Sequence, residues 1–153
     1  MYKTANVRQS GFTLLEIMIV LVIIGLLSAM ILPNILSKQE QAQFTKVKSD
    51  IVALESALTS YKLDNYRFPT TDQGLEALVR RPDVSPEPKN YPDGGYIRRL
   101  PNDPWDNPYQ YIQPGENGPF DVWTLGADGA PGGEGENRDI GNWNLDEAGK
   151  KQR

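Results

Sequence analysis

The feature that most constrains this chain is an unbroken apolar run near its start. From Phe12 to Leu32 the sequence reads FTLLEIMIVLVIIGLLSAMIL, in which Glu16 is the only charged side chain. As an α-helix this run would be roughly 32 Å long at about 1.5 Å per residue, close to the thickness of a bilayer's hydrocarbon core. The basic side chains before it predict that the N-terminus stays in the cytoplasm. We therefore expect residues 12–33 to span a membrane once.

Glu16 distinguishes this run from an ordinary signal or anchor. A cleaved secretory signal has an apolar region of roughly 7–15 residues followed by a small-x-small site, and no such site stands before Pro33. A simple membrane anchor has no use for a carboxylate, which costs about 2.5–3.5 kcal/mol near the bilayer centre. The side chain of Glu16 therefore needs a partner.

Composition removes several classes of function. The 153 residues include no cysteine and no histidine, which excludes disulfides, thiolate nucleophiles and histidine-ligated metals. A formal net charge of −4 argues against nucleic acid as a partner. A membrane-anchored hydrolase that uses carboxylates such as Asp103 or Asp106 stays open as an alternative.

Beyond Pro33 the sequence becomes amphipathic. Apolar residues recur at spacings of four and three, as on one face of a helix. They are Val47, Ile51, Leu54, Leu58 and Tyr61. The pattern predicts a helix from Phe12 to about Asp64, roughly 80 Å long if unbroken. Gly25 and Pro33 are its weak points, because glycine is flexible and proline lacks an N–H donor.

The remaining sequence predicts a small head with short elements. Thr70 and Gln73 form a capping-box pattern before the segment TTDQGLEALVRR, which predicts a short helix ended by Pro82. The β-rich segments 109–112 and 120–124 are joined by QPGENGP, which predicts an antiparallel hairpin. A long helix with a small sheet packed against its apolar stripe makes the fold class α+β.

The last loop combines flexibility with negative charge. Residues 125–143 read LGADGAPGGEGENRDIGNW, with six glycines and several carboxylates. Oxygen ligands without histidine or cysteine suit calcium or magnesium better than zinc. Composition alone nevertheless favours a solvated acidic loop over a metal site.

The N-terminal segment RQSGFTLLEIMIVLVIIGLLSAMILP resembles the class III prepilin signal of type IV pilins and their relatives. The resemblance implies that residues 1–11 are a leader, that a membrane peptidase cuts after Gly11, and that the new amine of Phe12 is methylated. A carboxylate at Glu16 would then pair with the amine of a neighbouring subunit inside an apolar core and set the register of assembly.

Four later segments resemble the major pseudopilins of type II secretion: FPTTDQGLEALV, LPNDPWDNPYQY, LGADGAPGGEGE and DIGNW. The resemblance implies a type IV pilin-like lollipop. Its parts would be an assembly helix at 12–33, an amphipathic helix at 34–66, a globular head at 67–143 and a flexible tail at 144–153.

The same resemblance implies a non-enzymatic subunit of a periplasmic filament that supports export of folded proteins across the outer membrane. The partners implied are further copies of the chain, minor pseudopilins, prepilin peptidase, an inner-membrane platform protein and an assembly ATPase. The chain would sit in the inner membrane with its head in the periplasm. A surface type IV pilin for adhesion or motility is the alternative, but such pilins usually close their C-terminal region with a disulfide.

The resemblance also implies a structural calcium ion in the last loop. Its implied ligands are the side chains of Asp128 and Asp139 and the carbonyls of Leu125 and Ile140, with help from Glu136 or Asn137.

Overall fold

The computed structural model describes residues 12–148, without the side chains of residues 29–37 and Ala148. The predicted leader, including Gly11, and the last five residues lie outside this range. The chain divides into two compact units, residues 1–39 and 40–153, which are described separately.

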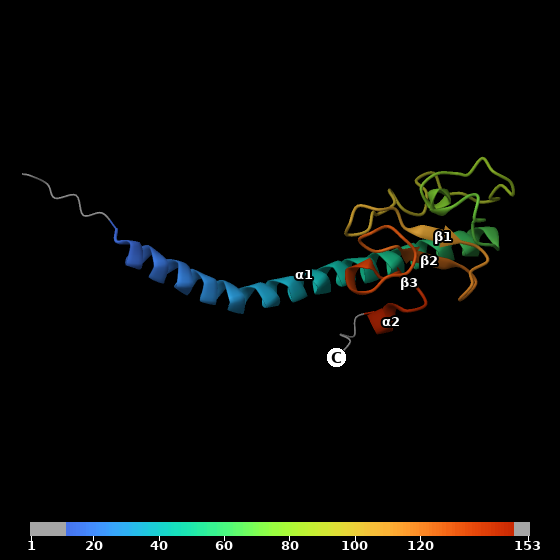
Figure 1. Cartoon of the computed structure of the whole chain (residues 1–153). Helices are drawn as coiled ribbons and strands as arrows, with labels where there is room; N and C mark the ends of the chain where they lie inside the picture. The colour runs from blue at the N-terminus through green and yellow to red at the C-terminus, as the bar shows by residue number, and fades with distance from the viewer. Residues whose placement is uncertain (1–11, 149–153) are drawn as a thin grey trace, which may run out of the picture. The chain divides into compact units, whose positions relative to one another are not determined.

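A single helix, α1, runs from Leu14 to Asn65 and contributes to both units (Figure 1). Its bounds confirm the prediction of a helix from Phe12 to about Asp64. The backbone stays helical through Gly25 and Pro33.

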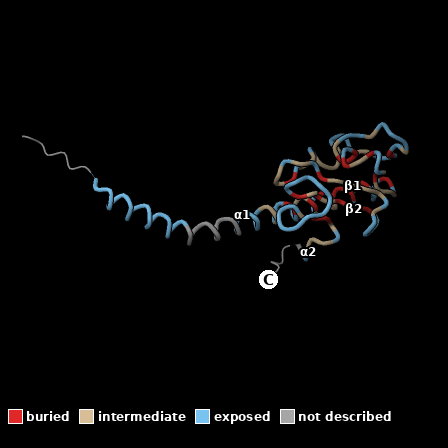
Figure 2. Tube along the Cα trace, viewed as in Figure 1, coloured by how far each residue is buried: buried red, intermediate tan, exposed pale blue. Residues whose placement is uncertain are grey.

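The apolar stripe of α1 forms one side of the core of the second unit. All five residues of the stripe are buried, as their spacing predicts. Figure 2 shows the same change along the chain, from an exposed first part of α1 to buried positions beside the sheet. Ala57, next to the stripe, is buried, whereas Ala53 is exposed to solvent.

A three-stranded antiparallel sheet covers this stripe. Its strands are β1 (Gln110–Ile112), β2 (Asp121–Thr124) and β3 (Ile140–Gly141), in the order β1-β2-β3. Tyr111 pairs with Val122 and confirms the predicted hairpin, although both strands begin one residue later than expected. The pairing of Thr124 with Ile140 adds a third strand that the sequence analysis did not anticipate.

The core lies between the helix, the sheet and the segments that connect them. Phe68 and Phe120 meet edge to face with ring centroids 4.6 Å apart, a favourable aromatic arrangement. The buried apolar residues are Val47, Ile51, Leu54, Ala57, Leu58, Tyr61, Leu75, Ala77, Leu78, Tyr109, Phe120, Val122 and Ile140. A helix layer packed on a small sheet confirms the predicted α+β class.

The short helix expected after Thr70 is smaller than predicted. The capping box is present: Thr70 N–H donates to Gln73 Oε1 at 3.0 Å, and Gln73 N–H donates to Thr70 Oγ1 at 3.3 Å. The box closes only a turn, because Gly74 adopts a φ of 60° and interrupts the helix. A 3₁₀-helix, η1 (Leu75–Leu78), follows.

The C-terminal segment also differs from expectation. Instead of a tail that frays from Asn144, residues Leu145–Ala148 form a short helix, α2. Asn144 ties it to the sheet: its Oδ1 accepts the Gly141 N–H at 2.9 Å, and its Nδ2 donates to the Asp139 carbonyl at 3.2 Å.

Candidate functional site

The start of α1 is capped by the residues of the predicted assembly signal. The N–H of Glu16 donates to Thr13 Oγ1 at 3.2 Å, and the N–H of Ile17 donates to the Thr13 carbonyl at 3.2 Å. Thr13 is therefore the N-cap, which satisfies a donor that the first helical turn would otherwise leave unpaired. Glu16 lies exposed in that first turn, where its negative charge complements the helix dipole.

The start of α1 is exposed along its length (Figure 2), and nearly all of its residues are apolar. From Phe12 to Leu27, each large hydrophobic side chain leaves between 47% and 79% of its surface exposed. Soluble proteins rarely expose a continuous apolar surface of this kind, which points to contact with lipid or with other proteins.

Across the described part of the chain, no helix is both long enough and apolar enough to cross a membrane. The membrane-spanning segment at 12–33 therefore stays a prediction.

The predicted calcium loop is closed at its base by the sheet. Because Thr124 pairs with Ile140, the residues that follow β2 and precede β3 begin and end side by side. The N–H of Ala127 donates to the Glu136 carbonyl at 2.9 Å. A Cβ at Gly126 would come within 2.7 Å of that carbonyl oxygen, so a glycine is required where the two sides of the loop meet.

Asp139 is the best-placed metal ligand among the predicted residues. Its Oδ2 accepts the Gly132 N–H at 2.9 Å, while its Oδ1 is buried without a hydrogen-bond partner. A buried carboxylate oxygen without a partner is costly, and a hard cation such as calcium would satisfy it. The loop therefore contains one oxygen that fits the implied ion.

The side chains of the other implied ligands do not gather around Asp139. Asp128 is exposed, and its Oδ1 accepts the Ala130 N–H at 3.1 Å. Glu136 and Asn137 are exposed in a short 3₁₀-helix, η2 (Gly135–Asn137). Nowhere within the described residues do three acidic side chains gather as a metal site. A calcium ion would therefore take several ligands from backbone carbonyls or water.

Asp103 holds the base of this loop, a role that the sequence analysis missed. Its buried carboxylate accepts the N–H groups of Trp105 at 3.0 Å and Asn107 at 2.8 Å, and the Thr124 hydroxyl at 2.5 Å. Thr124 Oγ1 in turn accepts the Gly126 N–H at 3.1 Å. The Asp-Pro-Trp-Asp-Asn sequence is typical of a turn, but nothing in it shows that the turn supports a distant loop.

These contacts bear on the hydrolase alternative. Asp103 is engaged in structural hydrogen bonds, and Asp106 is exposed with its Oδ1 accepting the Asn102 side-chain amide at 2.8 Å. The two carboxylates therefore have separate structural partners.

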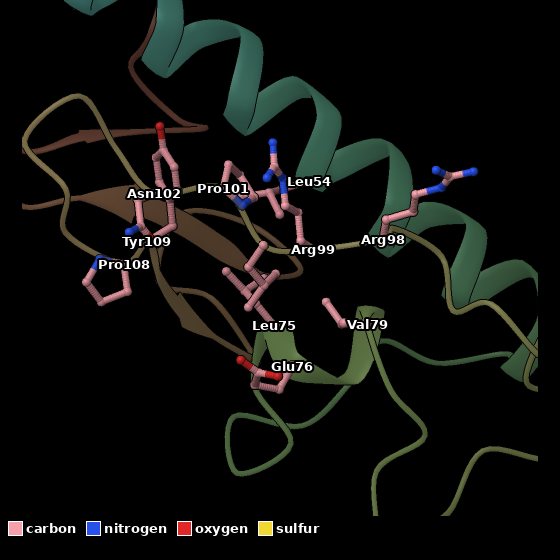
Figure 3. A pocket seen from close by; sticks show the side chains of 11 residues that line it. Leu54, Leu75, Glu76, Val79, Arg98, Arg99, Pro101, Asn102, Pro108 and Tyr109 are labelled. Atoms are coloured by element: carbon pink, nitrogen blue, oxygen red, sulfur yellow. The ribbon is translucent and has the colours of Figure 1, made fainter.

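A cavity of about 370 Å³ lies between α1, η1 and the segment before β1 (Figure 3). Glu76 is the one carboxylate in its lining, and its Oε2 lies 3.7 Å from Arg80 Nε. Arg98 and Arg99, which also line the cavity, are exposed. The lining consists of Leu54, Leu75, Glu76, Val79, Arg98, Arg99, Leu100, Pro101, Asn102, Pro108 and Tyr109.

Comparisons with known proteins agree with this architecture. Residues 34–143 match the family described as type II secretion system protein G, and residues 6–32 match the prokaryotic N-terminal methylation motif. A type II secretion system core protein G from Vibrio cholerae serotype O1 is 61% identical over 138 residues, which cover 90% of this chain and 94% of the relative. Its counterpart from Escherichia coli K12 is 52% identical over 141 residues, covering 92% and 95%.

A solved structure is similar over most of this chain. The crystal structure of the major pseudopilin from the type 2 secretion system of enterohaemorrhagic Escherichia coli has a TM-score of 0.66 and 53% identity. The match covers 72% of this chain and 95% of that chain. Together with the matched family and the methylation motif, this similarity identifies the chain as a member of the type II secretion system protein G family of major pseudopilins.

Proposed function

We propose that this chain is a structural subunit that polymerises into the periplasmic pseudopilus of a type II secretion system and supports export of folded proteins across the outer membrane. The observation that carries the proposal is the segment from Phe12 to Leu27, whose large apolar side chains are all exposed and which contains one carboxylate, Glu16. Such a surface is stable in lipid or against copies of itself. The relatives named core protein G supply the secretion system.

Processing creates the group that pairs with Glu16. Cleavage between Gly11 and Phe12 gives Phe12 a free amine, which is then methylated, in agreement with the methylation motif at residues 6–32. In the assembled filament the Glu16 carboxylate of one subunit lies against the Phe12 amine of the next. An unpaired charge in that apolar core is expensive, so only the correct register is stable.

The chain works with the rest of the secretion machinery. Before assembly it is anchored in the inner membrane, with its N-terminus in the cytoplasm and its head in the periplasm. Prepilin peptidase processes it, minor pseudopilins join the filament, and a platform protein with an assembly ATPase drives polymerisation. Its role is structural rather than enzymatic.

A calcium ion stabilises the last loop of the head. The buried, unpartnered Oδ1 of Asp139 supports a cation at this position. The resemblance adds the side chain of Asp128 and the carbonyls of Leu125 and Ile140, with Glu136 or Asn137 completing the shell. Calcium accepts such mixed oxygen ligands because its coordination is flexible.

Deletion of the gene in its host tests the filament role. We expect proteins that are normally secreted to accumulate in the periplasm, and wild type but not Glu16→Val to restore secretion. Glu40→Val is the matched control, because Glu40 is an exposed carboxylate elsewhere on α1. Unchanged secretion combined with loss of surface filaments or twitching would instead favour the type IV pilin alternative.

Calcium addition to the purified full chain in detergent tests the metal site. We expect calcium to raise the melting temperature of wild type and of Glu134→Ala, and a chelator to reverse the increase. Asp139→Ala and Asp139→Asn should lose the response. The asparagine variant keeps the size and shape of the side chain, so its loss of response would not be explained by unfolding. An equal response in all four proteins would refute this site.

A further inference from the structure

The connection between β1 and β2 contains a reactive dipeptide that the filament role does not use. Asn117 is the only asparagine in the sequence that is followed by glycine. Asparagine side chains are thermally labile, and a following glycine places no side chain in the way of ring closure. We propose that Asn117 is a site of spontaneous deamidation in the folded protein, and that the product loosens the β1–β2 connection.

The nucleophile of this reaction is accessible. Asn117 and Gly118 are both exposed, and a Cβ built at Gly118 would meet only the Phe120 carbonyl oxygen, at 3.7 Å. Within the described part of the chain, the Gly118 N–H donates no hydrogen bond. Its backbone nitrogen is therefore free to approach the side chain of Asn117.

The reaction needs no partner except water. The Gly118 nitrogen attacks Asn117 Cγ and forms a new C–N bond. The bond from Cγ to Nδ2 breaks, and the Gly118 amide proton leaves with the side-chain nitrogen as ammonia. Water then opens the cyclic imide at either carbonyl, which leaves aspartate or isoaspartate at position 117.

Asp121 determines both the rate and the consequence. Asn117 Nδ2 donates to Asp121 Oδ2 at 2.9 Å, and the Asn117 backbone N–H lies 3.1 Å from the same oxygen. The Glu116 N–H also donates to it at 2.9 Å. The side-chain hydrogen bond restrains the Asn117 amide, so we expect Asp121 to slow ring closure without blocking the nucleophile.

The product places a second carboxylate against a buried one. Asp121 is 2% exposed, so it has little access to water that would screen a new negative charge. The amide donor is lost and two like charges face each other, which favours separation of the loop from β2. Isoaspartate also lengthens the backbone, which displaces the N–H groups of Glu116 and residue 117 from Asp121.

Incubation of the purified full chain in detergent, followed by peptide mass spectrometry, tests the first step. We expect the amide-to-acid mass change at Asn117 before any other asparagine, with both isomers present. Gly118→Ala should slow it several-fold, and Asp121→Asn should accelerate it several-fold. An intact Asn117 after other asparagines have reacted, or reaction only in urea, would overturn the proposal.

Limited proteolysis tests the second step. Asn117→Asp should be cleaved several-fold faster than wild type between β1 and β2. Asn102→Asp is the matched control, because the same change there faces the exposed Asp106 and should leave cleavage unchanged. Equal cleavage of Asn117→Asp and wild type would refute the predicted loosening.

Discussion

Asp103 shows how much one buried side chain organises in this head. Its carboxylate joins the turn at residues 103–107 to Thr124, at the end of β2. A carboxylate is suited to this position because it accepts several hydrogen bonds and donates none. The chain therefore uses a charged group as an internal support, at a position where sequence reasoning considered catalysis.

Replacement of Asp103 by alanine would leave two backbone N–H groups and one hydroxyl without an acceptor. We expect a loss of about 2–3 kcal/mol in the free energy of unfolding, measured by denaturant titration. Asp106→Asn is the control, since Asp106 is exposed with a φ of 69° that asparagine tolerates. A similar loss in both variants would show that the network around Asp103 is not responsible.

Tyr96 makes the free energy of unfolding depend on pH in the alkaline range. Burial, with a hydrogen bond to Asp64, raises the pKa of Tyr96 from 10.0 to about 12. The unfolded chain therefore loses this proton at a lower pH than the folded chain. The stabilisation is complete below pH 10 and is lost as the pH rises toward 12. Denaturant titrations across this range should show falling stability, with a smaller fall in Tyr96→Phe; identical slopes would contradict the assignment.

Among the elements, α1 shows most directly how the spacing of apolar residues determines which of them are buried. Leu58 and Leu63 have the same side chain on the same helix, yet Leu58 is fully buried and Leu63 is 73% exposed. The stripe pattern assigns only Leu58 to the core. Position on the helix, rather than residue type, decides which leucine contributes to stability.

This pair gives a matched prediction. Leu58→Ala should cost about 2–5 kcal/mol of unfolding free energy, because it removes buried methyl groups and leaves a cavity. Leu63→Ala should change it by no more than about 0.5 kcal/mol. Denaturant titration of both variants measures the difference, and comparable losses would contradict the burial pattern.

The sequence predicted the elements with a regular pattern and missed those without one. The helix and the β1–β2 hairpin were accessible because periodicity and turn residues define them locally. Strand β3 could not be predicted, because Ile140 and Gly141 show no alternating pattern. They pair with β2 only after a long loop closes. The capping box at Thr70 was correct, but the left-handed backbone at Gly74 limited what followed it. The candidate loop was located by composition and resemblance, while its support by Asp103 depends on the contact with Thr124, which is distant in sequence.

At the scale of the whole molecule, the core formed by the described residues lies in the second unit. Every apolar residue of the core cluster, including the partly buried ones, lies between Phe44 and Leu145. The large apolar residues from Phe12 to Leu27 are exposed and do not belong to that cluster. The head therefore contains the interactions that it needs to fold.

A fragment of residues 40–153 should accordingly fold alone in water and unfold in one cooperative transition. The full chain should require detergent or lipid, because the large apolar residues from Phe12 to Leu27 are exposed. Calorimetry and analytical ultracentrifugation measure both properties. A fragment that aggregates or melts without a cooperative transition would contradict this division.

The pairing of Thr124 with Ile140 also has an evolutionary consequence. Since the strands fix where the last loop leaves and re-enters the sheet, its length can change without moving either end. Lengthening a closed loop costs little, about 0.6 kcal/mol for each doubling. A Cβ built at Gly129 or Gly135 would meet nothing within 4 Å, so we expect these exposed positions to accept insertions. This part of the head can therefore diverge between lineages, or carry an inserted epitope, while the sheet keeps its register.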